Sequence, residues 1–258
     1  NWRNLVVFVL LSVFALANLL YHVDAMRGNI AAQGVGLRIG VSSVVMMISV
    51  IGGRVVPSFT RNWLVQRKAE RLPAPPMQRF DKAVLGLTAV ALVGWCALPG
   101  QLLTGVALLV AGVLHLARLA RWQGLQTLSE PLLWVLHLGY AFVPLGAVFL
   151  GLSIVMRDVF TIAAAQHFWM AGAFGLMTLA MMTRATLGHT GQDLHAGPAT
   201  LAIYLSLIGA VLARFGAALW VGFAMQFYTL SAVLWIAAFA GFAIVYGRCL
   251  IKPKPARG

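Results

Sequence analysis

TIAAAQHFWMAGAFGLMTLAMMTRATLGHTGQDLH, residues 161–195, joins a long apolar segment to a short polar one. The segment Thr161–Thr183 is almost wholly apolar. As an α-helix it would be roughly 35 Å long, which is enough to cross the hydrocarbon core of a bilayer. This stretch therefore predicts a membrane-spanning helix that ends in a polar turn.

One face of that predicted helix gathers side chains that can bind a metal, because positions three or four residues apart share a face. The stripe defined by this spacing comprises His167, Met170, Phe174, Met177 and Met181. It leads to Arg184 and to a turn that contains His189, Asp193 and His195. Methionine and phenylalanine at this spacing usually serve packing, but an ionisable side chain within a membrane usually faces a bundle interior or a functional site. His167 is therefore the first candidate for a functional residue.

Composition assigns the chain to the polytopic membrane proteins. Of its 258 residues, 61% are hydrophobic and 10% are charged, and the mean hydropathy is +0.88. A soluble domain does not need that much apolar surface. We therefore predict an all-α transmembrane helix bundle that forms a single domain over residues 1–258, with the lipid bilayer as its partner. Cys96 and Cys249 lie far apart in apolar surroundings and are interpreted as packing residues.

Eight apolar runs predict eight membrane-spanning helices. They cover 4–23, 34–56, 83–98, 102–119, 131–155, 161–183, 198–221 and 227–247. Between the second and third runs, Gly52, Gly53 and Pro57 are expected to break the helix. Residues 66–82, which are rich in proline and charge, are expected to form a cytoplasmic linker.

Positive charge is unevenly distributed between the two sides of the predicted bundle. The chain has 19 Lys and Arg against 6 Asp and Glu, a balance that would suggest nucleic-acid binding in a soluble protein. With eight crossings, 15 of the basic residues lie on the side of the two chain ends and 4 on the other. Because cytoplasmic loops of membrane proteins carry the excess of Lys and Arg, both ends are predicted to be cytoplasmic. The charges then set topology, and no nucleic-acid partner is expected.

The predicted orientation sorts the histidines by depth. His115 and His137 form an inner pair, and Tyr140 lies about one turn from His137 on the same face. His167 and His22 form a looser outer pair. A neutral imidazole offers a lone pair to a transition metal while its other nitrogen donates to a neighbouring acceptor. Histidines on facing helices could therefore hold a haem iron from both sides, or from one side with the other open to a gas.

Thioethers and one arginine extend the candidate site. The methionines of the stripe are soft ligands that suit Cu(I) or an axial haem position. Arg184 could pair with a haem propionate or with Asp193, because guanidinium binds carboxylates through two parallel hydrogen bonds. The predicted cofactor-binding residues are His22, His115, His137, His167 and Arg184. The predicted metal ligands are His167, Met170, Met177 and His189.

Five runs of residues carry a resemblance to a known family. They are 18–22 (NLLYH), 51–62 (IGGRVVPSFTRN), 115–122 (HLARLARW), 130–140 (EPLLWVLHLGY) and 181–191 (MMTRATLGHTG). In this order, and over essentially the whole chain, they closely resemble the NnrS family. The resemblance implies a bacterial inner-membrane protein that contains haem and copper and is linked to nitric oxide exposure, in denitrification or nitrosative stress. It also implies that further membrane helices precede this chain, which is similar to the C-terminal portion of a family member.

Three functional hypotheses follow from these observations. The leading one is a haem and copper protein that protects against nitric oxide by binding it or turning it over. The second is a transporter or channel, whose polar path would follow broken segments at Gly52–Gly53 and Gly188–His189. The third is an accessory protein that passes metal along the methionine stripe without catalysis. A Soret band in the visible spectrum of the purified protein would support the first hypothesis over the second.

The charge distribution generates a topology prediction. Reporter fusions at Lys68 and Lys254 should both give a cytoplasmic signal, and a fusion near Gly100 should give an external one. The imbalance of 15 to 4 is large enough to survive small errors in the helix boundaries. An external signal at Lys68 would overturn the predicted orientation.

Overall fold

The protein is an all-α bundle, as predicted. The computed structural model describes residues 2–156 and 161–251, and within them it contains helices and no strand. Eight helical spans of this described part are long and apolar enough to cross a membrane, which confirms a multi-pass membrane protein. Lys254, one of the fusion sites named above, lies outside the described residues.

The spans are built from α-helical and π-helical segments. The α-helices are α1 (Trp2–Met26), α2 (Val35–Met47), α3 (Gly53–Gln66), α4 (Arg79–Ala97), α5 (Leu102–Ala120), α6 (Pro131–Val155), α7 (Ile162–His167), α8 (Met177–Thr190), α9 (Pro198–Leu219) and α10 (Ala224–Ile251). Two π-helical segments join α2 to α3 and α7 to α8. They are η2 (Ile48–Gly52) and η4 (Phe168–Leu176). Short 3₁₀ turns are η1 (Ala31–Gln33), η3 (Gly124–Thr127) and η5 (Val221–Phe223).

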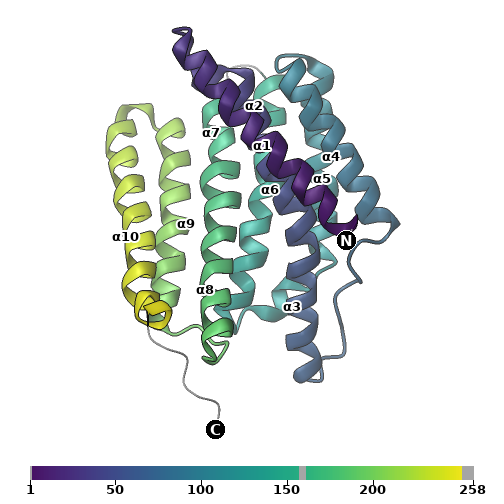
Figure 1. The fold of residues 1–258 in the computed structure, drawn as a ribbon, viewed down its shortest axis with the longest axis vertical. Coiled ribbons are helices and arrows are strands. Elements are labelled where there is room, and N and C mark those ends of the chain that lie inside the picture. Colours follow the sequence, from purple (N-terminus) through teal and green to yellow (C-terminus); the bar gives the residue numbers. More distant parts are fainter. Residues whose placement is uncertain (1, 157–160, 252–258) are drawn as a thin grey trace.

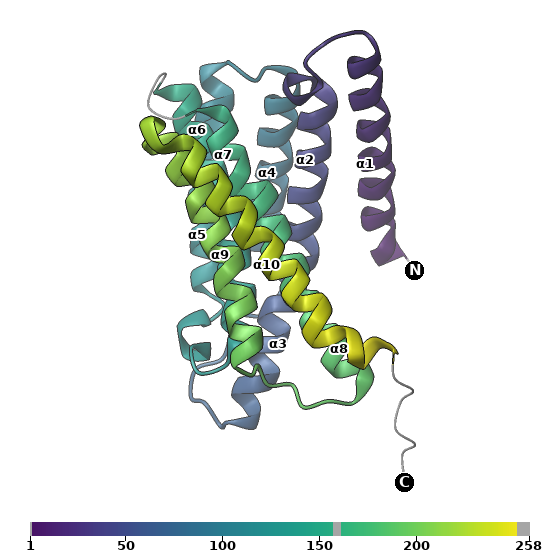
Figure 2. The ribbon, with the colours of Figure 1, turned by 90° about the vertical axis from the view of Figure 1, so that its left-hand side faces the viewer.

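α6 is the central helix of the bundle. It contacts α3, α5, α7 and α8 as well as both π-helical segments, and most of its side chains are buried. α1 lies on the outside, where it packs against α2 and buries only Ala17 among its described side chains. α10 runs obliquely across α9 and α8 (Figures 1 and 2). The outward apolar surfaces of α1 and α10 therefore suit contact with lipid.

The helix continues through Gly52, Gly53 and Pro57, so the predicted break there is wrong. Val35–Gln66 forms a single helical span of 32 residues. Within lipid, every backbone N–H and C=O needs a partner inside the protein, and a helix provides these partners even where glycine and proline weaken it. At η2 the bonding changes to the wider π pattern, from residue i to residue i+5. The linker that follows is shorter than predicted and covers residues 67–78.

The π-helical segment η4 divides the predicted stripe of residues 167–181. A π turn holds more residues than an α turn, so the faces of α7 and α8 are out of phase across it. His167 and Met170 lie on the wall of a cavity described below. Met177 is instead buried against α6, where a Cβ added at Gly139 would lie 3.0 Å from its sulfur. The expectation of one connected stripe is therefore wrong.

α8 extends beyond the predicted helix end at Thr183. It runs to Thr190, so Gly188 and His189 lie within its last turns rather than in a polar loop. Gly191 follows with a φ of 75°, a left-handed conformation that glycine adopts easily and that commonly ends helices. Both segments that were expected to be broken are thus helical, and the transporter hypothesis loses the polar path that it required.

Glycines allow α5 and α6 to approach each other closely. A Cβ added at Gly112 of α5 would lie 2.6 Å from Cγ2 of Val148 and 3.0 Å from the carbonyl oxygen of Pro144. A Cβ added at Gly151 of α6 would lie 2.8 Å from the carbonyl oxygen of Gly105. These distances leave no room for a side chain, so the close packing of the two backbones depends on glycine.

Replacing Gly112 with alanine should destabilise the bundle. The methyl group would meet a backbone carbonyl, which cannot move aside as a flexible side chain can, so we expect a loss of about 1–3 kcal/mol. Gly86→Ala in α4 is the matched control, because nothing lies within 4 Å of a Cβ at that position. Thermal unfolding in detergent should show a lower midpoint for Gly112→Ala only. Equal midpoints for the two variants would contradict the close α5–α6 packing.

Candidate functional site

A large apolar cavity lies in the half of the bundle opposite the 67–78 linker. Its volume is about 750 Å³, and its walls come from α1, α2, α7, η4, α9 and α10. Most of the lining side chains are aliphatic or aromatic. The polar and ionisable ones are Asn18, Tyr21, His167, Arg214, Tyr228 and Ser231. The cavity can therefore accommodate a mainly apolar ligand with a few polar contacts.

His167 lines this cavity with one of its ring nitrogens already used. Its Nδ1 lies 2.5 Å from the carbonyl oxygen of Ala163, one turn earlier in α7. A carbonyl oxygen can only accept, so Nδ1 donates and the neutral ring keeps a lone pair on Nε2. Histidines that bind metals are commonly held this way, because the bonded nitrogen orients the ring and the other serves as the ligand. Met170 adds a thioether to the same cavity.

Arg214 of α9 brings a positive charge to the cavity. Its guanidinium carbon lies 4.3 Å from the centre of the Tyr228 ring, and both residues line the cavity. It forms no ion pair with any residue that the structure describes. The site thus combines an apolar interior with one imidazole and one unpaired guanidinium.

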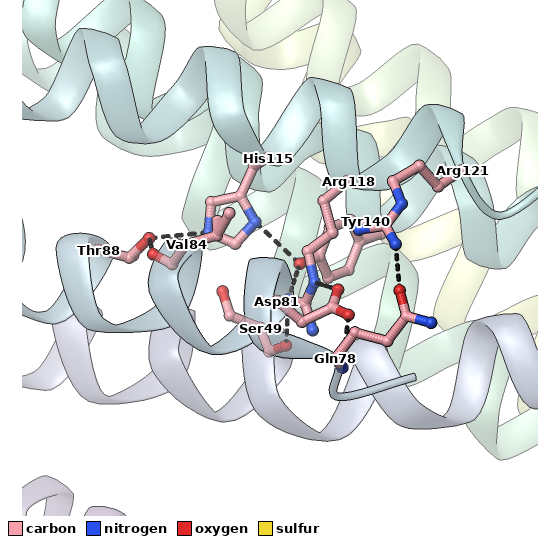
Figure 3. A network of polar contacts seen from close by, with 9 residues as sticks. All are labelled: Ser49, Gln78, Asp81, Val84, Thr88, His115, Arg118, Arg121 and Tyr140. Atoms are coloured by element: carbon pink, nitrogen blue, oxygen red, sulfur yellow. Dashed lines mark hydrogen bonds and ion pairs between the residues drawn. The ribbon is translucent and has the colours of Figure 1, made fainter. Parts of the chain in front are cut away.

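A buried polar network occupies the other half of the bundle (Figure 3). Arg118 of α5 is fully buried, and its Nε donates to Oδ1 of Asp81 in α4 over 2.7 Å. Its Nη1 donates to the carbonyl oxygen of Ser49 over 2.9 Å and to the hydroxyl oxygen of Tyr140 over 2.7 Å. Asp81 also accepts from the backbone N–H of Gln78 over 2.9 Å, at the start of α4. The carboxylate neutralises the buried cation, and the contacts join four segments of the bundle.

His115 extends this network from Tyr140. Thr88 donates its hydroxyl hydrogen to the carbonyl oxygen of Val84 over 2.7 Å, so its oxygen accepts from Nε2 of His115 over 2.9 Å. Nδ1 of the neutral ring then accepts from the Tyr140 hydroxyl over 2.9 Å. Protein groups therefore use both ring nitrogens of His115. In this arrangement it offers no nitrogen to a metal.

His137 is held in a similar way but keeps one nitrogen without a partner. Thr60 donates to the carbonyl oxygen of Val56 over 2.9 Å and accepts from Nε2 of His137 over 2.8 Å. Nδ1 of His137 is buried, and no described residue forms a hydrogen bond with it. A Cβ added at Gly124 would lie 2.7 Å from this atom, so the backbone of η3 packs against it. The nitrogen is thus free of partners but lacks space beside it for a cofactor.

The predicted inner pair of His115 and His137 is not a facing pair. Aromatic rings connect the two histidines in series. The ring centres lie 5.8 Å apart for His115 and Tyr140, 4.5 Å for Tyr140 and Trp122, and 6.4 Å for Trp122 and His137. Side chains of the protein therefore fill the region between the imidazoles. The expectation that this pair shares a cofactor does not fit these contacts.

Three other predicted ligands lie away from the cavity. His22 is exposed on α1, where its ring meets that of Tyr21 edge-on. His189 is exposed near the end of α8, and Met177 is buried against α6. Their roles as ligands stay predictions. Of the predicted ligand set, only His167 and one methionine line the cavity.

Arg184 and His195 find their contacts near the other end of the bundle. The guanidinium carbon of Arg184 lies 4.1 Å from the ring centre of Phe59, and the described residues show no ion pair between Arg184 and Asp193. Nδ1 of His195 lies 2.9 Å from Oε2 of Glu130, whose other carboxylate oxygen caps α6. Across the described chain, no group of three or more His, Cys, Asp or Glu residues comes together that could hold a metal ion.

The sequence alone does not identify Asp81, Thr60, Thr88 or Arg214 as site residues. The sequence does contain one indication for Asp81. It is an acidic residue at the start of one apolar run, and Arg118 at the end of the next run lies at the same depth, so the two can form an ion pair. The threonines carry no comparable signal, since hydroxyl side chains are common within membrane helices. Arg214 stands in a mainly apolar run, which is itself unusual for a cation.

These features define a multi-pass α-helical membrane protein with a ligand-sized apolar cavity in one half and a neutralised polar network in the other. The chain matches the NnrS family, described as NnrS protein, over residues 1–254. It therefore belongs to this family, as the resemblance of its sequence indicated. No curated protein and no solved structure matches the chain.

The ion pair between Arg118 and Asp81 should show strong energetic coupling. Arg118→Met leaves a buried carboxylate without its cation, and Asp81→Asn leaves a buried cation without its carboxylate. Each single change should therefore destabilise the protein by about 3–5 kcal/mol. The double variant removes both charges and should cost less than the sum. Asparagine retains an oxygen that can accept from the Gln78 backbone, so the start of α4 is preserved. Unfolding of the wild type and the three variants in one detergent completes the cycle, and strict additivity would argue against the pair.

Proposed function

We propose that the chain is a haem-binding membrane protein of the bacterial response to nitric oxide, in which His167 would hold the haem iron. Membership of the NnrS family supports the link to nitric oxide. The observation that carries the haem site is the cavity of about 750 Å³, to whose wall His167 contributes a ring with a free Nε2 lone pair. Ligand sites in proteins are usually about 300–1,000 Å³ in volume, largely apolar, and equipped with a few placed polar groups. The cavity has each of these properties.

The residues of the cavity fit a haem in their chemistry. Aromatic side chains such as Trp169 and Phe174 provide flat apolar surfaces for a macrocycle. Among the described lining residues, His167 alone carries an imidazole, so it is the histidine that would hold the haem iron. When bound, haem would supply an iron atom that can bind nitric oxide.

The surrounding chain supports this role of His167 in two ways. The carbonyl oxygen of Ala163 accepts from Nδ1, which fixes the tautomer and makes Nε2 the more basic ligand. The mostly apolar lining favours a mainly apolar ligand beside the ring. The outermost helices α1 and α10 form part of the wall, so a small neutral molecule dissolved in the bilayer needs no polar path to reach the cavity.

The proposal places the protein in the bacterial inner membrane with both ends of the chain in the cytoplasm. The excess of Lys and Arg on the side of the chain ends supports this orientation. The cavity would then lie in the outer half of the membrane. Nitric oxide that enters from outside or from the bilayer would then reach His167 before it reaches the buried network of Arg118 and Asp81 in the inner half.

Copper stays an expectation from the family resemblance. His167 and Met170 are the described lining residues that offer a nitrogen and a thioether to such an ion. Two ligands do not complete a copper site, and the described residues form no larger cluster of His, Cys, Asp or Glu. The haem proposal therefore does not depend on copper.

His167→Gln tests the haem site. Glutamine keeps hydrogen-bonding capacity but is a poor iron ligand, so we expect loss of the Soret band or at least about tenfold weaker haem binding. Mutations of residues that only hydrogen-bond a metal ligand already weaken binding by about tenfold or more, and loss of the ligand itself should cost at least as much. His195→Gln is the matched control, because His195 belongs to neither predicted ligand set, lies outside the cavity, and can be replaced by a glutamine that still donates to Glu130. Both variants should reach the membrane in equal amounts. Wild-type haem content and an unchanged spectrum in His167→Gln would rule out the proposed ligand.

A further inference from the structure

We infer that Arg214 binds the carboxylate end of the cavity's ligand, so that the site recognises an apolar, planar molecule that carries a carboxylate. The inference rests on the proposed haem site and names the contact that would orient the ligand within it. His167 would hold the centre of such a molecule, and Arg214 would hold its charged edge.

The charge of Arg214 has no counterpart in the described protein. The described residues that line the cavity include no aspartate or glutamate, and Arg214 forms no ion pair among them. The buried guanidinium of Arg118, in contrast, forms an ion pair with Asp81, which neutralises its charge. An unpaired cation within a membrane-spanning helix is costly. A carboxylate brought by a ligand would reduce that cost, and the ligand would gain a strong contact in return.

The contact between Arg214 and Tyr228 leaves the hydrogen-bond donors of the guanidinium available. The guanidinium lies over the ring, with its carbon 4.3 Å from the ring centre. This stacking uses the flat face of the group, whereas its N–H donors lie in its plane and point outward. None of these donors bonds to a described residue. A planar fork of free donors is the geometry that holds a carboxylate through two parallel hydrogen bonds.

Arg214 and His167 can contact the same ligand. Both line the cavity, His167 from α7 and Arg214 from α9, and these two helices are in contact. A metalloporphyrin has its metal at the centre and its carboxylates at one edge, so a single molecule can satisfy both residues. An anionic lipid could also approach Arg214, but it would make no use of the imidazole. The combination therefore favours a porphyrin carboxylate over a lipid headgroup.

The arginine that sequence reasoning assigned to this task is a different one. Arg184 was expected to pair with a propionate, but it does not line the cavity and lies over the ring of Phe59 instead. We therefore assign the carboxylate contact to Arg214 of α9 in place of Arg184 near the end of α8. The new position has the free donors and the apolar surroundings that the contact requires.

Haem and its dimethyl ester provide a direct test. The ester keeps the macrocycle and the iron but has no negative charge on its propionate groups. The full chain in nanodiscs of phosphatidylcholine, a lipid without net charge, is titrated with each ferric compound, and the Soret absorbance gives the two dissociation constants. Wild-type protein should bind haem at least about tenfold more tightly than the ester, because tenfold is near the lower limit of what hydrogen bonds to a charged group contribute.

Three variants locate this preference. Arg214→Gln should bind haem at least about tenfold more weakly, down to the affinity for the ester, while its affinity for the ester stays unchanged. Arg214→Lys keeps the charge without the planar fork and should show an intermediate ratio. Arg61→Gln is the matched control, because Arg61 is exposed on α3, outside the cavity, and it should keep the wild-type ratio. Unchanged binding of the ester also shows that the cavity of each variant is intact.

The possible results separate the inference from the proposed function. If Arg214→Gln keeps the wild-type preference for haem while His167→Gln loses its Soret band, the haem site stands and the carboxylate contact is refuted. If the wild type binds neither compound, the proposed haem site itself is refuted. A third titration includes phosphatidylglycerol in the nanodiscs. Persistence of the preference supports the porphyrin carboxylate, whereas its loss would identify an anionic lipid as the partner of Arg214.

Discussion

The structure depends on the neutralisation of one buried charge. Arg118 is fully buried among the helices, and an uncompensated cation in such a place is costly. Asp81 supplies the opposite charge, while Ser49 and Tyr140 accept further hydrogen bonds. Because these partners belong to α4, η2 and α6, placing one guanidinium fixes four segments relative to one another. Gly53 provides the necessary space, since a side chain there would collide with the guanidinium.

The bilayer made much of the fold predictable from the sequence. An apolar run that is long enough to cross has to be helical, because no water is present to bond an open backbone. The spans therefore follow the predicted order. Their ends were less predictable, since α3 and α8 continue into polar sequence beyond Val56 and Thr183. The helix break predicted at Gly52 and Gly53 was wrong for a related reason. Helix propensities describe chains in water, and inside a bundle the cost of an unbonded backbone outweighs them.

The candidate site was predictable only in part. His167 can be identified because an imidazole within an apolar run is itself unusual. The cavity beside it, and the place of Arg214 in its wall, depend on how α1, α9 and α10 pack, and residue patterns do not encode that arrangement. The predicted pair of His115 and His137 shows what residue patterns do not determine. Depth along a helix does not tell which way a side chain points, and His115 points toward Thr88 and Tyr140.

The π-helical segment η4 also determines how far α7 is rotated about the helix axis relative to α8. His167 stands directly before this segment and Met177 directly after it. Each residue of an α-helix advances about 100° around the axis, and a π turn takes up an additional residue without ending the helix. The number of residues in Phe168–Leu176 and their π pattern together therefore set the angle between the imidazole and the faces of α8. In this span the number of residues and the pattern of their backbone bonds decide what the imidazole faces.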